Sequence, residues 1–124
     1  MDVFQSGNPG SPAFQVKRYP FYLLNRLVSR YHRIIDARLR VIKLDIPSWR
    51  VLMILGESSP RATQEIADVA VINISTTTRI LQRMAAAELV TLASSSKDAR
   101  VTLVCLAPFG KAQLTKARQA TAPI

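Results

Sequence analysis

The segment from Ile74 to Leu89 constrains the fold of this chain more than any other segment. Its apolar residues recur at steps of three and four, which predicts a helix with one buried face. That face consists of Ile74, Ile80, Leu81, Met84, Ala85 and Leu89. Asn73 or Ser75 can cap the helix, because a short polar side chain accepts a hydrogen bond from a free N–H group of the first turn.

The opposite face of this helix carries hydroxyl and guanidinium groups that suit contact with DNA. Hydroxyl groups bond phosphates or base edges, and arginine pairs with guanine or phosphate. We expect the DNA-binding residues of this helix to be Ser75, Thr76, Thr77, Arg79 and Arg83. The alternative is an ordinary solvated helix with a Ser/Thr cap, and the neighbouring segments favour the first interpretation.

A short helix is expected just upstream, over residues 62–70, with Ile66 and Ala67 on its inner face. Residues 71–74 connect it to the helix that begins at Ile74. Two short helices with a tight connection are typical of a helix-turn-helix, whose second helix reads DNA.

Two strand-like segments follow, at residues 89–93 and 100–106, with a polar tip between them. Their β-branched residues and partial alternation predict a hairpin. The expected fold class is therefore mainly α with a small β-hairpin wing, a winged helix-turn-helix. The tip supplies Lys97, Asp98 and Arg100, and an arginine there can enter the narrow minor groove while Asp98 holds its guanidinium.

These residues resemble the MarR-type transcriptional regulators. The likeness is carried by Pro47-Ser-Trp-Arg-Val-Leu52, Gln64-Glu-Ile-Ala67, Thr78-Arg79 with Met84, Leu89-Val90, Asp98-Ala-Arg100, Leu103-Val-Cys-Leu106 and Gly110. It covers residues 23–111. The family usually has Gly before the Leu-Val pair, where this chain has Glu88.

The resemblance implies a homodimer that binds double-stranded DNA at a near-palindromic operator. Two recognition helices would enter successive major grooves, and the wings would enter the flanking minor grooves. A small aromatic effector bound between the lobes would alter the spacing of the recognition helices. The family continues through two long C-terminal helices, whereas this sequence stops fourteen residues after Gly110, so a weaker dimer is expected.

The N-terminal part reads as a tail followed by a long helix. Residues 1–20 hold four Gly or Pro residues close together, which predicts a flexible tail. Residues 21–44 form an amphipathic helix whose apolar stripe is wide for a lone surface helix. We expect a second chain to cover Leu24, Leu27, Tyr31 and Ile35. Within one domain spanning residues 21–124, this helix and residues 107–124 would serve dimerisation, and residues 47–106 would form the DNA-binding lobe with its wing at 89–106.

Three further positions have specific expectations. Pro47 suits the first turn of a helix, and Trp49 is expected as a core anchor rather than a ligand contact. Cys105 is expected as a small buried hydrophobic residue. A final helix is expected over residues 111–121.

The net charge of +9 favours a polyanionic partner, but it is unevenly distributed. Residues 46–106 carry six basic and five acidic groups, so the expected DNA-binding lobe is nearly neutral. The single cysteine cannot form an internal disulfide and no segment is apolar enough to span a membrane, so a cytoplasmic protein is expected.

No phosphate-binding loop, metal-ligand cluster or catalytic triad is evident, and no enzyme activity, cofactor or metal is expected. The expected function is sequence-specific regulation of transcription. The alternative is a shortened paralogue that pairs with a full-length regulator and binds DNA poorly alone.

Overall fold

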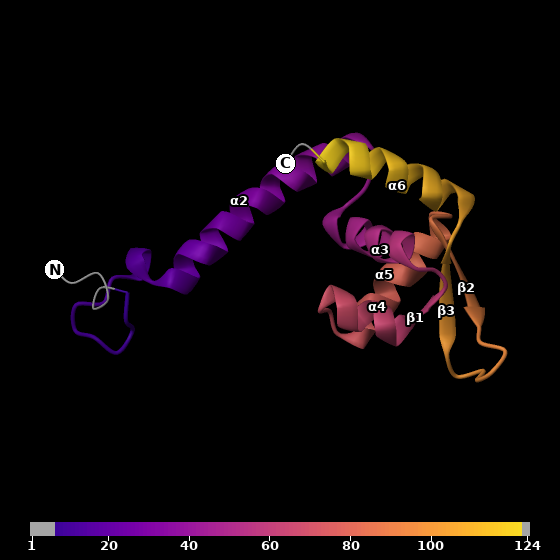
Figure 1. Cartoon of the computed structure of the whole chain (residues 1–124), viewed down its shortest axis with the longest axis horizontal. Coiled ribbons are helices and arrows are strands. Elements are labelled where there is room, and N and C mark those ends of the chain that lie inside the picture. Colours follow the sequence, from indigo (N-terminus) through magenta and orange to yellow (C-terminus); the bar gives the residue numbers. More distant parts are fainter. Residues whose placement is uncertain (1–6, 123–124) are drawn as a thin grey trace. The chain divides into compact units, whose positions relative to one another are not determined.

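The computed structural model of the protein describes residues 7–122 and contains two compact units, Met1–Ile35 and Asp36–Ile124. Figure 1 shows the elements within them and labels all but the first. In chain order they are the 3-10 helix η1 (Val16–Arg18), α2 (Pro20–Val41), α3 (Ile46–Glu57), β1 (Arg61–Ala62), α4 (Thr63–Ala70), α5 (Ile74–Ala86), β2 (Val90–Ser94), β3 (Thr102–Leu106) and α6 (Pro108–Thr121). This mainly helical chain with one small antiparallel sheet confirms the predicted fold class.

Helix α2 ends at Val41, three residues before the predicted end. Leu24, Leu27 and Tyr31 are exposed on it, and their role in dimerisation stays a prediction. Ile35 differs from this expectation, because it is fully buried within the single chain. Leu39, one turn further on, is also buried, so the apolar stripe of α2 changes from exposed to buried between Tyr31 and Ile35.

Helix α3 begins where the sequence predicts. The Asp45 carboxylate accepts a hydrogen bond from the backbone N–H of Ser48, and Pro47 lies in the first turn. Val51, Leu52 and Leu55 are buried and form the centre of the core. Trp49 is only half-buried, so it lies at the edge of the core rather than at its centre.

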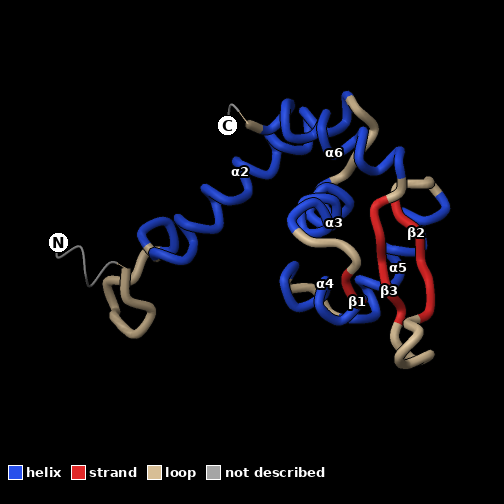
Figure 2. Tube along the Cα trace, turned by 45° about the vertical axis from the view of Figure 1, so that its right-hand side comes forward, coloured by secondary structure: helices blue, strands red, loops and turns tan. Residues whose placement is uncertain are grey.

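The sheet has three strands in the order β1-β3-β2, all antiparallel (Figure 2). The predicted hairpin is confirmed, with Val90 opposite Leu106 and Ser94 opposite Thr102. The sequence does not predict β1, which pairs Arg61 with Val104 on the other side of β3. Two residues are too few for an alternating pattern, so only the pairing defines this strand.

Helices α2, α4 and α5 end in the same way, with a left-handed residue that is not glycine. Lys43, Val71 and Glu88 have φ angles of 61°, 57° and 64°. In each case the next N–H bonds a carbonyl five residues back, as Leu89 does to Met84 at 2.9 Å. This is the Schellman arrangement, in which glycine usually takes the left-handed position. Glu88 therefore occupies the place where the resembled family usually has glycine.

Helix α6 begins at Pro108, three residues before the predicted start, and packs against α3. A Cβ atom at Gly110 would overlap the carbonyl oxygen of Leu89, so only glycine allows α6 to approach the start of β2 this closely. Two side-chain hydrogen bonds also hold α6. The Gln113 amide donates to the Ile42 carbonyl oxygen at 2.8 Å, and the Arg38 guanidinium donates to the Ala120 carbonyl oxygen at 3.1 Å.

Val71 allows a direct test of the left-handed helix ends. Its side chain is 89% exposed, so replacing it loses almost no packing. A left-handed conformation costs a non-glycine residue roughly 1–2 kcal/mol, and glycine at position 71 removes this cost. Glycine also gives the unfolded chain more conformational entropy, which lowers the stability gained by about 0.5–1 kcal/mol. We expect Val71→Gly to raise the free energy of unfolding by about 0.5–1 kcal/mol, measured as a higher urea midpoint at unchanged slope. Val69→Gly, at a right-handed position in the last turn of α4, is the control and should lower stability. Equal or lower stability of Val71→Gly would contradict this account.

Candidate nucleic-acid interface

Helices α4 and α5 form a helix-turn-helix with a connection of three residues, 71–73. The Asn73 side chain accepts a hydrogen bond from the Thr76 N–H at 2.8 Å, so Asn73 rather than Ser75 caps α5. Ile66 and Ala67 of α4 are buried, as predicted. As the second helix of this helix-turn-helix, α5 is the candidate recognition helix.

The buried face of α5 differs from the prediction at its N-terminal end. Ile80, Leu81 and Met84 are buried as expected, but Ile74 is 43% exposed. The prediction that Thr77 lies on the outer face is wrong, because its side chain is only 1% exposed. Its hydroxyl donates to the Asn73 carbonyl at 2.9 Å, which satisfies the polar group inside the core.

The outer face of α5 carries Ser75, Arg79 and Gln82, all exposed. Thr76 is partly exposed beside them, and its hydroxyl lies 3.5 Å from the Arg79 guanidinium. Gln82 is not among the predicted site residues, although it follows Arg79 by three positions and Ser75 by seven. That spacing places it on the same face, and its amide can bond adenine in two places.

Arg83 lies near the C-terminal end of α5 and is engaged within the protein. Its guanidinium is 2.9 Å from the carboxylate of Asp45, just before the start of α3. The sequence places Arg83 among the groups free to contact DNA, whereas the fold gives it an acidic partner that is distant in the chain.

The wing tip is organised by Asp98 and Arg100, as predicted. The Asp98 carboxylate accepts two hydrogen bonds from the Arg100 guanidinium, at 3.1 and 3.2 Å, and one from its backbone N–H at 3.0 Å. The Arg100 side-chain bond, followed by its backbone bond, lowers the pKa of Asp98 below its ordinary value. The Arg100 side chain is nevertheless 91% exposed, so it is both oriented and accessible. Lys97 is also exposed on this tip.

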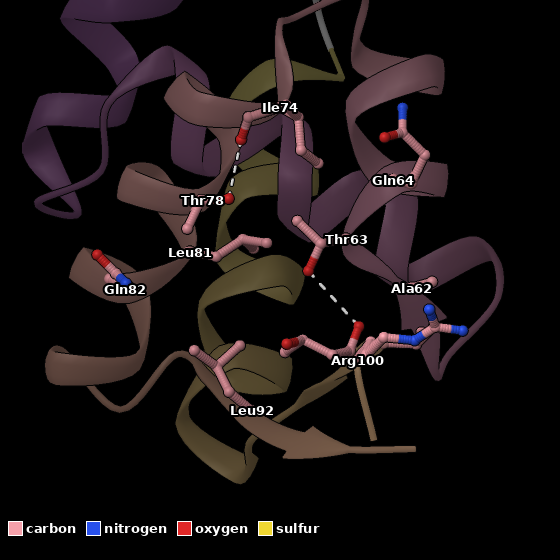
Figure 3. Close-up of a pocket in the computed structure, with 11 residues that line it drawn as sticks. Ala62, Thr63, Gln64, Ile74, Thr78, Leu81, Gln82, Leu92 and Arg100 are labelled. Atoms are coloured by element: carbon pink, nitrogen blue, oxygen red, sulfur yellow. Dashed lines mark hydrogen bonds between the residues drawn. The ribbon is translucent and has the colours of Figure 1, made fainter. Parts of the chain in front are cut away.

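Recognition helix and wing face each other across an open groove of about 430 Å³ (Figure 3). Thr78 and Gln82 line it from α5, Leu92 and Arg100 from the hairpin, and Gln64 from α4. The structure therefore brings predicted wing and helix elements to one surface, together with Gln82 and Gln64, which are not among the predicted site residues.

Other site chemistries find little support in the part of the chain that the structure describes. Over residues 7–122, no three His, Cys, Asp or Glu side chains gather as metal ligands. Cys105 is partly exposed rather than fully buried as predicted. No helix among the described residues combines the length and the apolar character that crossing a membrane requires.

The fold and this surface define a winged helix-turn-helix protein. The sequence profile of the MarR family matches residues 44–102. A curated relative, the HTH-type transcriptional repressor IacR of Pseudomonas putida, is 37% identical over 114 residues, which cover 92% of this chain and 68% of that repressor.

Two solved structures share the fold at lower identity. A mutant of MarR from E. coli complexed with operator DNA has a TM-score of 0.76 at 20% identity, over 79% of this chain and 70% of that one. CouR from Rhodococcus jostii RHA1, bound to p-coumaroyl-CoA, has a TM-score of 0.79 at 16% identity, over 88% and 77% of the two chains. The chain belongs to the MarR family of DNA-binding transcriptional regulators.

Thr77 and Thr78 form a matched pair that tests the observed rotation of α5. Both hydroxyls bond a carbonyl four residues back, but only the Thr77 side chain is fully buried. We expect Thr77→Ala to lower the free energy of unfolding by roughly 1 kcal/mol or more, through the lost bond and the cavity left behind. Thr78→Ala should change it by less than about 0.5 kcal/mol. Denaturant unfolding measures both, and equal effects of the two substitutions would argue against this rotation.

Proposed function

We propose that the protein binds a specific DNA operator as a homodimer, with α5 in the major groove and the wing in the minor groove. The observation that carries the proposal is the groove that Gln82 of α5 and Arg100 of the wing line together. Arg79 is also exposed on α5, three residues before Gln82. Arginine and glutamine are suited to reading guanine and adenine, and an exposed wing arginine suits the electronegative minor groove. Ser75, Thr76 and Lys97 would add contacts to the phosphate backbone.

The E. coli MarR mutant described above is complexed with operator DNA, which supports the same role for this fold here. In such architectures a dimer places its two reading helices about one helical turn apart, so the half-sites would be spaced by about 10–10.5 base pairs. The operator is therefore proposed to be near-palindromic.

An aromatic effector is proposed to release the DNA. CouR carries p-coumaroyl-CoA, an aromatic acyl thioester, and this supports an aromatic ligand class for a relative of the same fold. A panel of aromatic carboxylates, titrated into the protein–operator complex, would identify the compound that raises the dissociation constant.

Specific reading by α5 can be tested on DNA selected from random sequences by the wild-type protein. We expect Arg79→Ala and Gln82→Ala to weaken binding to that site by about 1–3 kcal/mol each, while non-specific binding changes less. Lys116→Ala, an exposed cation on α6, is the control and should leave the preference for the selected site unchanged. If both α5 variants bind the selected site as wild type does, α5 is not the reading element.

The homodimer can be tested on α2. Leu27 is 65% exposed, and exposed apolar stripes of this width mark protein interfaces. We expect Leu27→Asp to convert a dimer into a monomer in sedimentation experiments, with unchanged helical circular dichroism and much weaker operator binding. Ser29→Asp adds the same charge on the opposite face of α2 and should leave the dimer intact. A wild-type protein that stays monomeric at high concentration, with or without operator DNA, would overturn the homodimer.

That outcome would favour the second candidate function, an interaction partner of another regulator. One observation supports this candidate: of the cations expected to meet DNA, Arg83 and Arg100 lie in ion pairs. In a lobe that carries six basic and five acidic groups, these pairs reduce the charge available to phosphates.

A further inference from the structure

Asp45 lies between α2 and α3, and its two carboxylate oxygens hold two different helices. Oδ1 accepts a hydrogen bond from the Ser48 N–H at 2.9 Å, which caps α3. Oδ2 lies 2.9 Å from Nη2 of Arg83, near the C-terminal end of α5. One side chain thus links the start of a core helix to the helix that faces DNA.

This ion pair lies at a shallow cleft of about 220 Å³. The cleft is lined by three buried residues, Leu44 from the α2–α3 junction, Met84 from α5 and Leu89 just after α5. Lys43 and Leu89 belong to the Schellman ends of α2 and α5, so two sharply turned segments meet beside the pair. The Asp45–Arg83 contact ties the two segments together across this cleft.

Asp45 is a charged partner for Arg83 at neutral pH. Burial raises the pKa of its carboxyl group, but the Ser48 hydrogen bonds and the Arg83 charge outweigh burial and hold the pKa below its ordinary value. An ionised carboxylate at this point repels phosphate, and it satisfies the guanidinium that would otherwise be free to bind DNA.

We infer that Asp45 is a positioning residue that fixes the recognition helix against the α2–α3 junction, and that Arg83 serves this ion pair instead of contacting DNA. The inference deepens the proposed DNA-reading function and rests on it. It gives Asp45 a role beyond the cap of α3, and it reassigns Arg83 from the DNA surface to the support of α5.

The test uses the full chain and operator DNA selected by the wild-type protein. Asp45→Asn removes the charge but keeps an oxygen that can cap α3 at Ser48, and Arg83→Gln removes the other partner. Both side chains are partly exposed, so each substitution should weaken operator binding by only about two- to fivefold. The double variant should be no weaker than either single variant, because both remove the same contact.

Two controls separate positioning from simple charge effects. Asp36→Asn removes a comparably exposed carboxylate, which pairs with Arg40 at 2.8 Å on α2, and should not weaken binding. Salt dependence separates Arg83 from a phosphate contact, because each lost phosphate contact lowers the slope of log affinity against log salt by about 0.9. Arg83→Gln should leave that slope unchanged.

Two results would overturn the inference. If Arg83→Gln lowers the salt slope by about one contact, Arg83 binds phosphate. If Asp45→Asn strengthens binding more than Asp36→Asn does, Asp45 competes with DNA for Arg83 rather than positioning α5.

Amide hydrogen exchange in the protein without DNA tests the pair independently of the proposed function. Asp45→Asn and Arg83→Gln should speed exchange in the last turn of α5 equally, and Asp36→Asn should not. Unchanged exchange in both variants would overturn the positioning role. A wild-type protein without DNA affinity but with this exchange pattern would overturn the proposed function and leave the ion pair as a support of α5.

Discussion

The rotation of α5 about its own axis determines what this lobe can present to DNA. The buried face of α5 consists of Thr77, Ile80, Leu81 and Met84. Burial of each large apolar side chain contributes about 1.5–3 kcal/mol to the stability of the fold. Once this face is fixed, helical geometry leaves Ser75, Arg79 and Gln82 outward. The Asn73 cap fixes where the helix starts, so the position of each outward residue along the helix axis is also set.

The DNA-binding lobe has little net positive charge, and some of its basic groups lie in ion pairs. The whole chain has a net charge of +9, yet the segment 46–106 is nearly neutral, and two of its arginines are held by aspartates. The two pairs differ in what they leave accessible. Asp98 orients Arg100 while the side chain stays open to solvent, whereas Asp45 ties Arg83 to another helix. Pre-oriented arginine loses less conformational entropy on binding, which favours specificity over bulk attraction.

The C-terminal ends of α2, α4 and α5 keep the left-handed Schellman geometry without the glycine that usually adopts it. Lys43, Val71 and Glu88 adopt left-handed conformations that glycine would adopt without strain. The Schellman hydrogen bonds and the buried residues that follow, such as Leu44 and Leu89, hold them there. At Gly110 no such substitution is possible, because the Leu89 carbonyl occupies the space that a Cβ atom would need.

The order of the main helices, the helix-turn-helix and the hairpin can all be predicted from the sequence, because periodicity, capping residues and β-branched runs are local signals. The sequence also predicts the Asp98–Arg100 pair, whose partners are two positions apart. The sequence does not predict β1, which is defined only by pairing with β3. Nor does it predict the burial of Thr77, which depends on how neighbouring helices pack against the first turn of α5. The ion-pair partner of Arg83 likewise depends on the tertiary fold. Asp45 is distant from Arg83 in the chain, and no periodic pattern in a sequence indicates a contact over such a separation.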